Sequence, residues 1–271
     1  MLNLHYVEQG QGQPLVLVHG WSQSTRCFAK QLAGLSDAYR VIAVDMRGHG
    51  ESPKPLHGYR VARLAADLHD FLVQHDLREV ALGGHSMGAS IIWSYLEQFG
   101  AERVAKLIFI DQAPLVTNGS GLSGEALAAA GCSFTPTSLY EIANAITSNR
   151  AATLQGLRSA FFSDAVSDAD FAMAVNESLK VPAECAARLL IDHASQDWRD
   201  VIAEVIPSLN LPTLVFGGEL ASIFPPQAAA WIAAQIPGAQ LSVFGRNEGG
   251  SHFMFWENPR KFNAVLRDFL G

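Results

Sequence analysis

Short runs of consecutive apolar residues alternate along the chain with longer stretches in which apolar positions recur every three or four residues. A run that is apolar at every position is typical of a strand covered on both faces of a parallel sheet. Such runs occupy residues 14–18, 41–44, 80–82 and 107–110, and a similar run with one threonine occupies residues 212–216. Because helical patterns separate several of these runs, the order of elements predicts an α/β fold with a mostly parallel sheet.

Helical spacing is clearest over residues 61–75, where Leu64, Leu68 and Leu72 mark one buried stripe. Further helices are expected over residues 24–35, 89–95, 227–235 and 262–270. Two more strands are expected over residues 2–8 and 241–244. Both halves of the chain therefore carry α/β patterning.

The middle of the chain is different, because strand patterns disappear between residues 116 and 209. Alanine-rich, helix-compatible stretches replace them at residues 125–130, 139–145, 151–161 and 183–193. We therefore expect an α/β core built from residues 1–115 and 210–271, with a helical cap insertion at residues 116–209.

One motif stands between a predicted strand and a predicted helix, Gly84-His85-Ser86-Met87-Gly88. A strand that turns at once into a helix strains the backbone of its turn residue and exposes that side chain at the tip. The G-x-S-x-G pattern alone also fits an ordinary glycine-rich turn. Here its strand, turn and helix context is complete, which favours Ser86 as a nucleophile.

Composition narrows the class of protein. The chain has 271 residues, 49% of them hydrophobic, which is enough for one sizeable core. Its net charge is −7 and no Lys/Arg cluster stands out, which argues against nucleic acid or a membrane surface as a partner. The first six residues lack signal-peptide features and no apolar run is long enough to span a bilayer, so we expect a cytoplasmic protein.

The three cysteines, Cys27, Cys132 and Cys185, are far apart and odd in number. This spacing fits neither a metal site nor a complete set of disulfides. We expect free thiols and no metal.

Four motifs together carry a family resemblance: HGW at residues 19–21, DMRGHGES at 45–52, GHSMG at 84–88 and SHFMFWENP at 251–259. With them the whole chain resembles an α/β-hydrolase with a helical cap. The resemblance implies a mostly parallel eight-stranded sheet with helices on both faces, and a Ser–His–acid triad at the carboxyl ends of the strands. Neither G-x-G-x-x-G nor a P-loop lysine follows the first buried run, which disfavours a nucleotide-binding fold.

A serine nucleophile needs a base that takes its proton and later returns it to the leaving group. His252 follows a glycine-rich loop after the last expected strand, where the family places its base. His193, in the expected cap, is the alternative. The histidines of the motif turns, His19, His49 and His85, are expected to support the loops instead.

The triad acid departs from the commonest family pattern. Counting back from Pro225, the usual aspartate position holds Ala221, which can neither orient nor stabilise an imidazolium. Two carboxylates could replace it: Asp111, directly after the strand at residues 107–110, and Glu219 on the later loop. We favour Asp111, because a carboxylate at the end of a buried strand needs a partner such as His252. The other interpretation of Asp111 is a residue that only caps a turn.

Attack on a carbonyl also needs hydrogen-bond donors for the developing oxyanion. The expected donors are the backbone N–H of Met87, at the start of the elbow helix, and that of Trp21, after His19-Gly20. The alternative for Trp21 is an aromatic plug on a tight turn.

Aromatic residues near these motifs are candidates for the wall of a substrate pocket, although such residues belong to a core more often than to a pocket. The candidates are Phe28, Phe161, Phe162, Trp198 and Phe253, together with the side chains of Trp21 and Met87. An apolar lining under a cap implies a small or medium hydrophobic substrate.

The predicted function is a serine hydrolase that cleaves a carboxylic ester or lactone through an acyl-enzyme, without a cofactor. A serine at the elbow disfavours epoxide hydrolase or dehalogenase chemistry, for which the family uses an aspartate. A C–C bond hydrolase and a cofactor-independent dioxygenase with the same His–acid pair remain alternatives. So does a non-catalytic ligand-binding protein on this scaffold. The sequence leaves monomer and homodimer equally open.

Overall fold

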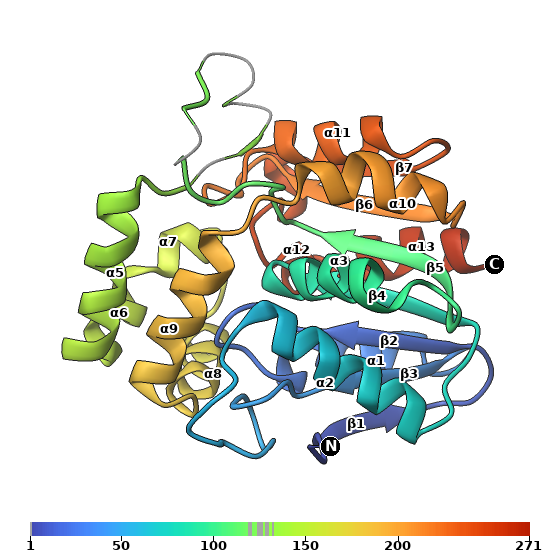
Figure 1. The fold of residues 1–271 in the computed structure, drawn as a ribbon, viewed down its shortest axis with the longest axis horizontal. Helices are drawn as coiled ribbons and strands as arrows, with labels where there is room; N and C mark the ends of the chain where they lie inside the picture. Colours follow the sequence, from blue (N-terminus) through green and yellow to red (C-terminus); the bar gives the residue numbers. More distant parts are fainter. Residues whose placement is uncertain (1, 119–120, 124–126, 128–129, 132) are drawn as a thin grey trace.

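A seven-stranded sheet forms the centre of the protein in a computed structural model, which describes residues 2–118, 121–123, 127, 130–131 and 133–271 (Figure 1). The strands are β1 (Tyr6–Gln9), β2 (Pro14–Val18), β3 (Arg40–Val44), β4 (Val80–His85), β5 (Val104–Ile110), β6 (Thr213–Gly218) and β7 (Gln240–Phe244). Their order across the sheet is β1-β3-β2-β4-β5-β6-β7.

The pairing is parallel throughout except between β1 and β3, which run antiparallel. The expected fold class is therefore confirmed, but the expected eighth strand is wrong for the described part of the chain. The first strand is also shorter than expected, because pairing with β3 begins at Tyr6.

Helices cover both faces of the sheet. Successive strand residues point to opposite faces, so each strand contributes side chains to the cores under both layers of helices. In β2, Val16 and Val18 belong to the core under one layer of helices, and Leu15 and Leu17 to the core under the other. The first layer contains α2 (Val61–Gln74), α3 (Met87–Phe99) and α11 (Pro226–Gln235). The second contains η1 (Thr25–Phe28), α1 (Ala29–Leu35), α12 (Met254–Glu257) and α13 (Pro259–Leu270).

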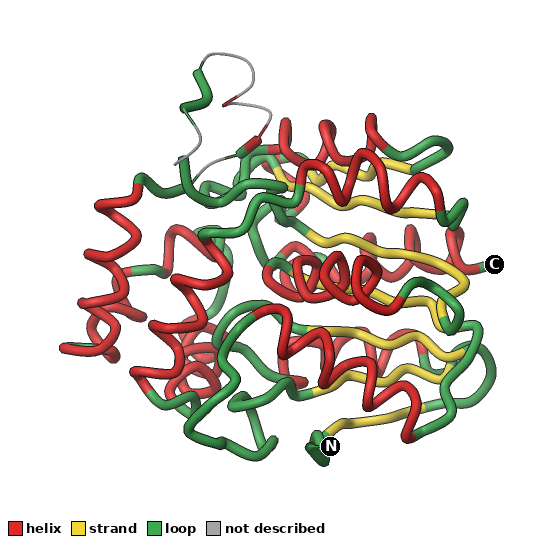
Figure 2. Tube along the Cα trace, viewed as in Figure 1, coloured by secondary structure: helices red, strands yellow, loops and turns green. Residues whose placement is uncertain are grey.

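A separate group of helices lies beyond the arrowheads of the parallel strands, at the left of Figure 1. Figure 2 shows helices and loops but no strand in this group. Its members are α5 (Pro136–Ser148), α6 (Arg150–Gly156), α7 (Arg158–Phe161), α8 (Asp168–Leu179) and α9 (Ala183–Ala194). We refer to α5–α9 as the cap helices.

The expected insertion at residues 116–209 also contains η2 (Val201–Val205) and α10 (Ile206–Ser208). Their buried residues, Val201, Ile202 and Ile206, share a core with α3 and α11 on the sheet. The sequence pattern did not predict α8, which begins with the N-cap Ser167 and the acidic residues Asp168 and Asp170. The helix expected at residues 125–130 lies largely outside the described residues.

Two of the three cysteines fall within the described residues. Cys27 and Cys185 are both buried free thiols, as expected. Cys132 lies outside the described residues. Within the described ranges, no helix is long and apolar enough to cross a membrane.

Candidate active site

Ser86 sits at the turn between β4 and α3 with φ 52° and ψ −127°, a backbone conformation that non-glycine residues rarely adopt. Crowding on both sides explains the two glycines of the motif. A Cβ on Gly84 would lie 2.4 Å from the carbonyl carbon of Gly88, and one on Gly88 would lie 2.2 Å from the Val18 carbonyl oxygen. The Ser86 N–H donates to the Ile110 carbonyl at 2.8 Å, which ties the turn to the neighbouring strand.

His252 and Asp111 form a buried pair beside this turn. The Nδ1–H of His252 donates to Asp111 Oδ2 at 2.5 Å, and the two side chains are only 3% and 2% exposed. Burial raises the pKa of the Asp111 carboxyl above its usual value, while the hydrogen bond from His252 acts in the opposite direction. Because Nδ1 is occupied by the carboxylate, Nε2 is the ring nitrogen free for proton transfer.

Sheet order explains how these residues meet. Asp111 directly follows β5, its N–H donates to the Phe216 carbonyl of β6 at 3.0 Å, and its φ is 47°. His252 follows β7 and the turn η3 (Arg246–Glu248). Parallel strands bring these ends to one edge of the sheet, next to Ser86 at the end of β4.

The loop around His252 is fixed by further hydrogen bonds. Ser251 Oγ donates to Glu257 Oε1 at 2.7 Å and accepts from the N–H of Phe253 at 3.1 Å. His85 Nε2 bonds the carbonyl of His252 at 2.9 Å. Hydrogen bonds within its own loop and from the elbow residue His85 therefore hold His252 in place.

Glu219, the alternative acid, lies away from this pair. Its exposed carboxylate accepts from the backbone N–H of Arg246 at 3.2 Å. Ala221, at the usual acid position, is buried and carries no polar group. The structure therefore brings Asp111, and not Glu219, to His252.

The two expected oxyanion donors belong to segments that border Ser86. Met87 is the first residue of α3, where backbone N–H groups have no acceptor within the helix. Trp21 follows Gly20, and a Cβ on Gly20 would lie 3.0 Å from the Cβ of Ser86. Both segments therefore border Ser86.

Two neutral histidines support the segment that carries Trp21. His19 Nε2 accepts from the Met46 N–H at 3.0 Å, and His49 Nε2 accepts from the Ser22 N–H at 3.2 Å. The Nδ1 atom of each ring bonds a backbone carbonyl, and the rings lie 4.8 Å apart. Burial lowers the pKa of both, so they stay neutral and can accept these bonds.

A cavity of about 620 Å³ opens between Ser86, His252 and the cap helices. Ser86 and His252 line its floor together with Trp21. The wall is mostly apolar and contains Val116, Phe134, Ile142, Ala145, Ile146, Leu157, Ala160, Phe161, Leu190, Ile223 and Phe224. Its polar members are Ser133, Ser138, Glu141, His193 and Ser222.

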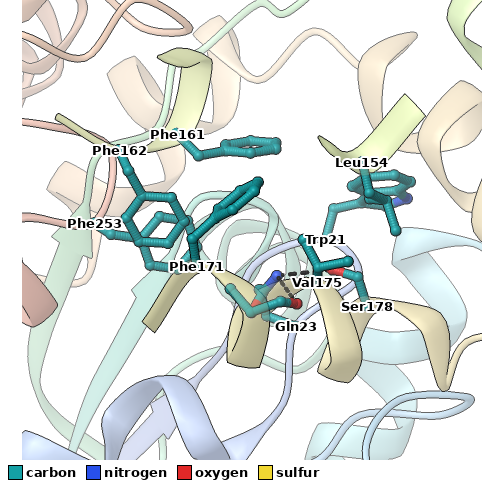
Figure 3. A pocket seen from close by; sticks show the side chains of 10 residues that line it. Trp21, Gln23, Leu154, Phe161, Phe162, Phe171, Val175, Ser178 and Phe253 are labelled. Carbon is teal, nitrogen blue, oxygen red and sulfur yellow. Dashed lines mark hydrogen bonds between the residues drawn. The ribbon is translucent and has the colours of Figure 1, made fainter. Parts of the chain in front are cut away.

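A cluster of aromatic side chains lines a second, smaller space, and two of its members, Phe161 and Phe253, also border Ser86 (Figure 3). Phe162 stacks on Phe253 with ring centroids 4.5 Å apart, and Phe161 and Phe171 lie beside them. The space left there is small, about 20 Å³ among these rings and about 30 Å³ beside Ser86. The site thus has one narrow and one wide side.

Three of the expected pocket residues lie elsewhere. Phe28 is buried in the core under α1, with its ring 5.2 Å from that of Phe255. The Met87 side chain is fully buried in the opposite core. Trp198 packs against Trp93 at 6.2 Å and lines a different hollow, on the outer face of α2 and α3. These corrections share one cause, since aromatic and apolar spacing fits a core as well as a pocket.

Trp21, Phe161 and Phe253 line spaces that Ser86 also borders, as expected, whereas Phe162 lines only the neighbouring space among the aromatic rings. The expectations missed Leu190 and Phe224, and named His193 only as a possible base. The spacing of Leu190 and His193 could have linked these two residues. They are three positions apart on α9, and residues three or four apart lie on one face of a helix.

The sheet, the elbow and the buried His–Asp pair define a class of protein, and the family comparison agrees. A family model described as the alpha/beta hydrolase fold matches residues 13–259, and the chain belongs to this family. Hydrolase activity is therefore supported. Among the described residues, no group of His, Cys, Asp and Glu side chains is placed to bind a metal ion.

Particular relatives add detail. The chain is 29% identical to a non-heme chloroperoxidase of Kitasatospora aureofaciens, over 100% of this chain and 96% of that one. It is similar to the crystal structure of a bromoperoxidase from Bacillus anthracis, with a TM-score of 0.89, 25% identity and coverage of 99% and 95%. An esterase from Exiguobacterium antarcticum gives a TM-score of 0.88, 28% identity and coverage of 98% and 95%.

Proposed function

We propose that the protein is a serine hydrolase that cleaves a carboxylic ester or lactone through an acyl-enzyme, with Ser86, His252 and Asp111 as its triad. One observation carries the proposal: His252, which is paired with the buried Asp111, lines the same cavity as Ser86. A serine hydroxyl is a weak nucleophile, so a base with a committed orienting acid is what acyl transfer requires.

In the first step, His252 Nε2 takes the hydroxyl proton as Ser86 Oγ attacks the substrate carbonyl. The backbone N–H groups of Trp21 and Met87 stabilise the oxyanion. The C–O bond to the leaving alcohol then breaks, and the alcohol takes the proton from His252. In the second step, water attacks the acyl-enzyme by the same route, releasing the carboxylic acid and free Ser86.

The shape of the site favours a substrate with one large hydrophobic part. The wide cavity is mostly apolar, and the space on the other side of Ser86 is about 30 Å³. The similarity to the Exiguobacterium esterase supports ester cleavage.

The similarity to chloroperoxidases and a bromoperoxidase supports a second candidate activity of the same acyl-enzyme. Hydrogen peroxide, attacking in place of water, releases a peroxy acid and free Ser86. The peroxy acid then oxidises a halide ion to hypohalous acid and leaves the carboxylic acid.

Ser86→Ala tests both candidates. We expect a folded protein whose hydrolysis of p-nitrophenyl esters falls by several orders of magnitude, because the acyl-enzyme can no longer form. Covalent labelling by a serine-directed fluorophosphonate should disappear, and so should halide oxidation in peroxide and carboxylate. Near-normal turnover in this variant would refute the proposal. Halide oxidation that survives without hydrolysis would require a route independent of Ser86.

The dioxygenase alternative has its own test. Oxygen uptake on adding a hydroxyquinolone, without any ester hydrolysis, would favour it over the proposed function.

A further inference from the structure

His193 is a polar side chain on the wall of the large cavity, contributed by the cap helix α9. It is only 3% exposed. Its Nδ1 atom is buried and has no hydrogen-bond partner among the described residues. A buried polar atom without a partner loses its hydration without compensation, which native structures rarely tolerate unless a water or a ligand supplies the missing bond.

Three other histidines near the site differ from His193 in this respect, and His85, whose Nδ1 also has no partner among the described residues, does not line the large cavity. His19 and His49 use both ring nitrogens, and His252 uses Nδ1 for Asp111 and keeps Nε2 for the proposed proton transfer. Because the imidazole of His193 lines the cavity wall beside the apolar Leu190, a group bound in the cavity can hydrogen-bond the ring, although Nδ1 itself is shielded.

We infer that His193 is a specificity-determining residue that hydrogen-bonds an uncharged oxygen, a ketone or hydroxyl, on the hydrophobic part of the substrate. This inference rests on the proposed function, since it names a substrate class for the same site. On this inference, His193 distinguishes substrates whose chain carries an oxygen from those with a plain alkyl chain. An alkyl chain contacts the apolar wall but leaves the imidazole without a hydrogen-bond partner.

The charge state of His193 supports an uncharged partner. Burial, reinforced by the nearby charge of His252, lowers its pKa to about 3. A neutral imidazole donates from one ring nitrogen and accepts at the other, so it can bond a ketone or a hydroxyl. It offers no positive charge to a carboxylate substituent.

A matched series of esters tests the inference. We would measure kcat/KM for p-nitrophenyl octanoate and its 4-oxo, 5-oxo and 6-oxo derivatives, each divided by its rate of hydrolysis by hydroxide. The wild type should prefer at least one oxo ester by about tenfold. His193→Leu should abolish that preference, measured as the ratio of kcat/KM for the oxo ester to kcat/KM for plain octanoate, and His193→Gln should restore part of it.

Leu190→Val is the control, because it changes the volume of the same wall without a polar group. It should change kcat/KM for all four esters by a similar factor. An equal oxo preference in the wild type and His193→Leu would overturn the inference, as would a wild type without any preference.

A binding measurement separates this result from the proposed function. In Ser86→Ala, which cannot turn over, the dissociation constant of 2-octanone should rise by about tenfold when His193→Leu is added. If no ester is hydrolysed by the wild type, the proposed function falls, and the ketone titration still decides on His193. Equal dissociation constants in the two backgrounds would refute its role.

Discussion

Replacing Asp111 with asparagine probes the least conventional part of the site. Asp111 Oδ2 lies 2.5 Å from His252 Nδ1, and both side chains are almost fully shielded from water. In the transition state His252 carries a positive charge, which the carboxylate stabilises and an amide does not. The amide could also present its NH₂ group to the ring and so favour the wrong tautomer.

We expect Asp111→Asn to lower kcat by up to about 10⁴-fold, as replacement of the triad acid does in serine proteases. This loss corresponds to about 5.4 kcal/mol of transition-state stabilisation. Glu219→Gln is the matched control, because its exposed carboxylate accepts from the Arg246 N–H and, among the described residues, has no hydrogen bond to His252. Its kcat should stay within a few-fold of the wild type.

The assay is steady-state hydrolysis of a p-nitrophenyl ester by both variants. Circular dichroism and urea unfolding would establish that each variant is folded before its kcat is compared. The reasoning would be refuted if Glu219→Gln were the more damaging change, or if a folded Asp111→Asn retained more than a tenth of the wild-type kcat.

Two further predictions concern packing and pH. Phe28→Ala should lower the free energy of unfolding by about 3–5 kcal/mol because it empties a core position, whereas Phe161→Ala should change KM more than stability. Urea unfolding and ester kinetics of the two variants check this, and a stable Phe28→Ala with a raised KM would contradict it. Acid should also destabilise the protein, because burial holds the pKa of several histidines below 6.5 in the folded state, so the unfolded state binds more protons below that pH. These histidines are His19, His49, His85 and His193. His193 alone accounts for about 1.4 kcal/mol per pH unit between pH 6.5 and about 3. Urea unfolding at pH 7.5 and 5.5 measures the effect, and equal stability at both pH values would be the contrary result.

Features that depend on a few neighbouring residues could be predicted from the sequence alone. Five short, largely apolar runs indicated strands, because such runs are typical of strands buried on both faces of a parallel sheet. The elbow was equally local: the strain at Ser86 and the crowding at Gly84 and Gly88 arise within one turn and the strand beside it. The motif residues also gave the family, which the family model confirms.

Tertiary structure decided which distant residues meet. His252 and Asp111 are 141 positions apart, and they meet because β5, β6 and β7 are neighbours in the sheet. The sequence favoured Asp111 but left Glu219 as an alternative, since both are carboxylates after a strand. Only the placement of its side chain toward Arg246 separates the two.

The pocket depended even more on the fold, because burial in a core and burial in a cavity wall have the same sequence pattern. Phe28 and Phe161 are both aromatic residues near motifs, yet one fills the core and the other faces the cavity. The same holds for the polar residue His193, whose surroundings cannot be predicted from the sequence. The sequence predicts its helix, but the lack of a hydrogen-bond partner for Nδ1 among the described residues appears only once α9 is packed against α5.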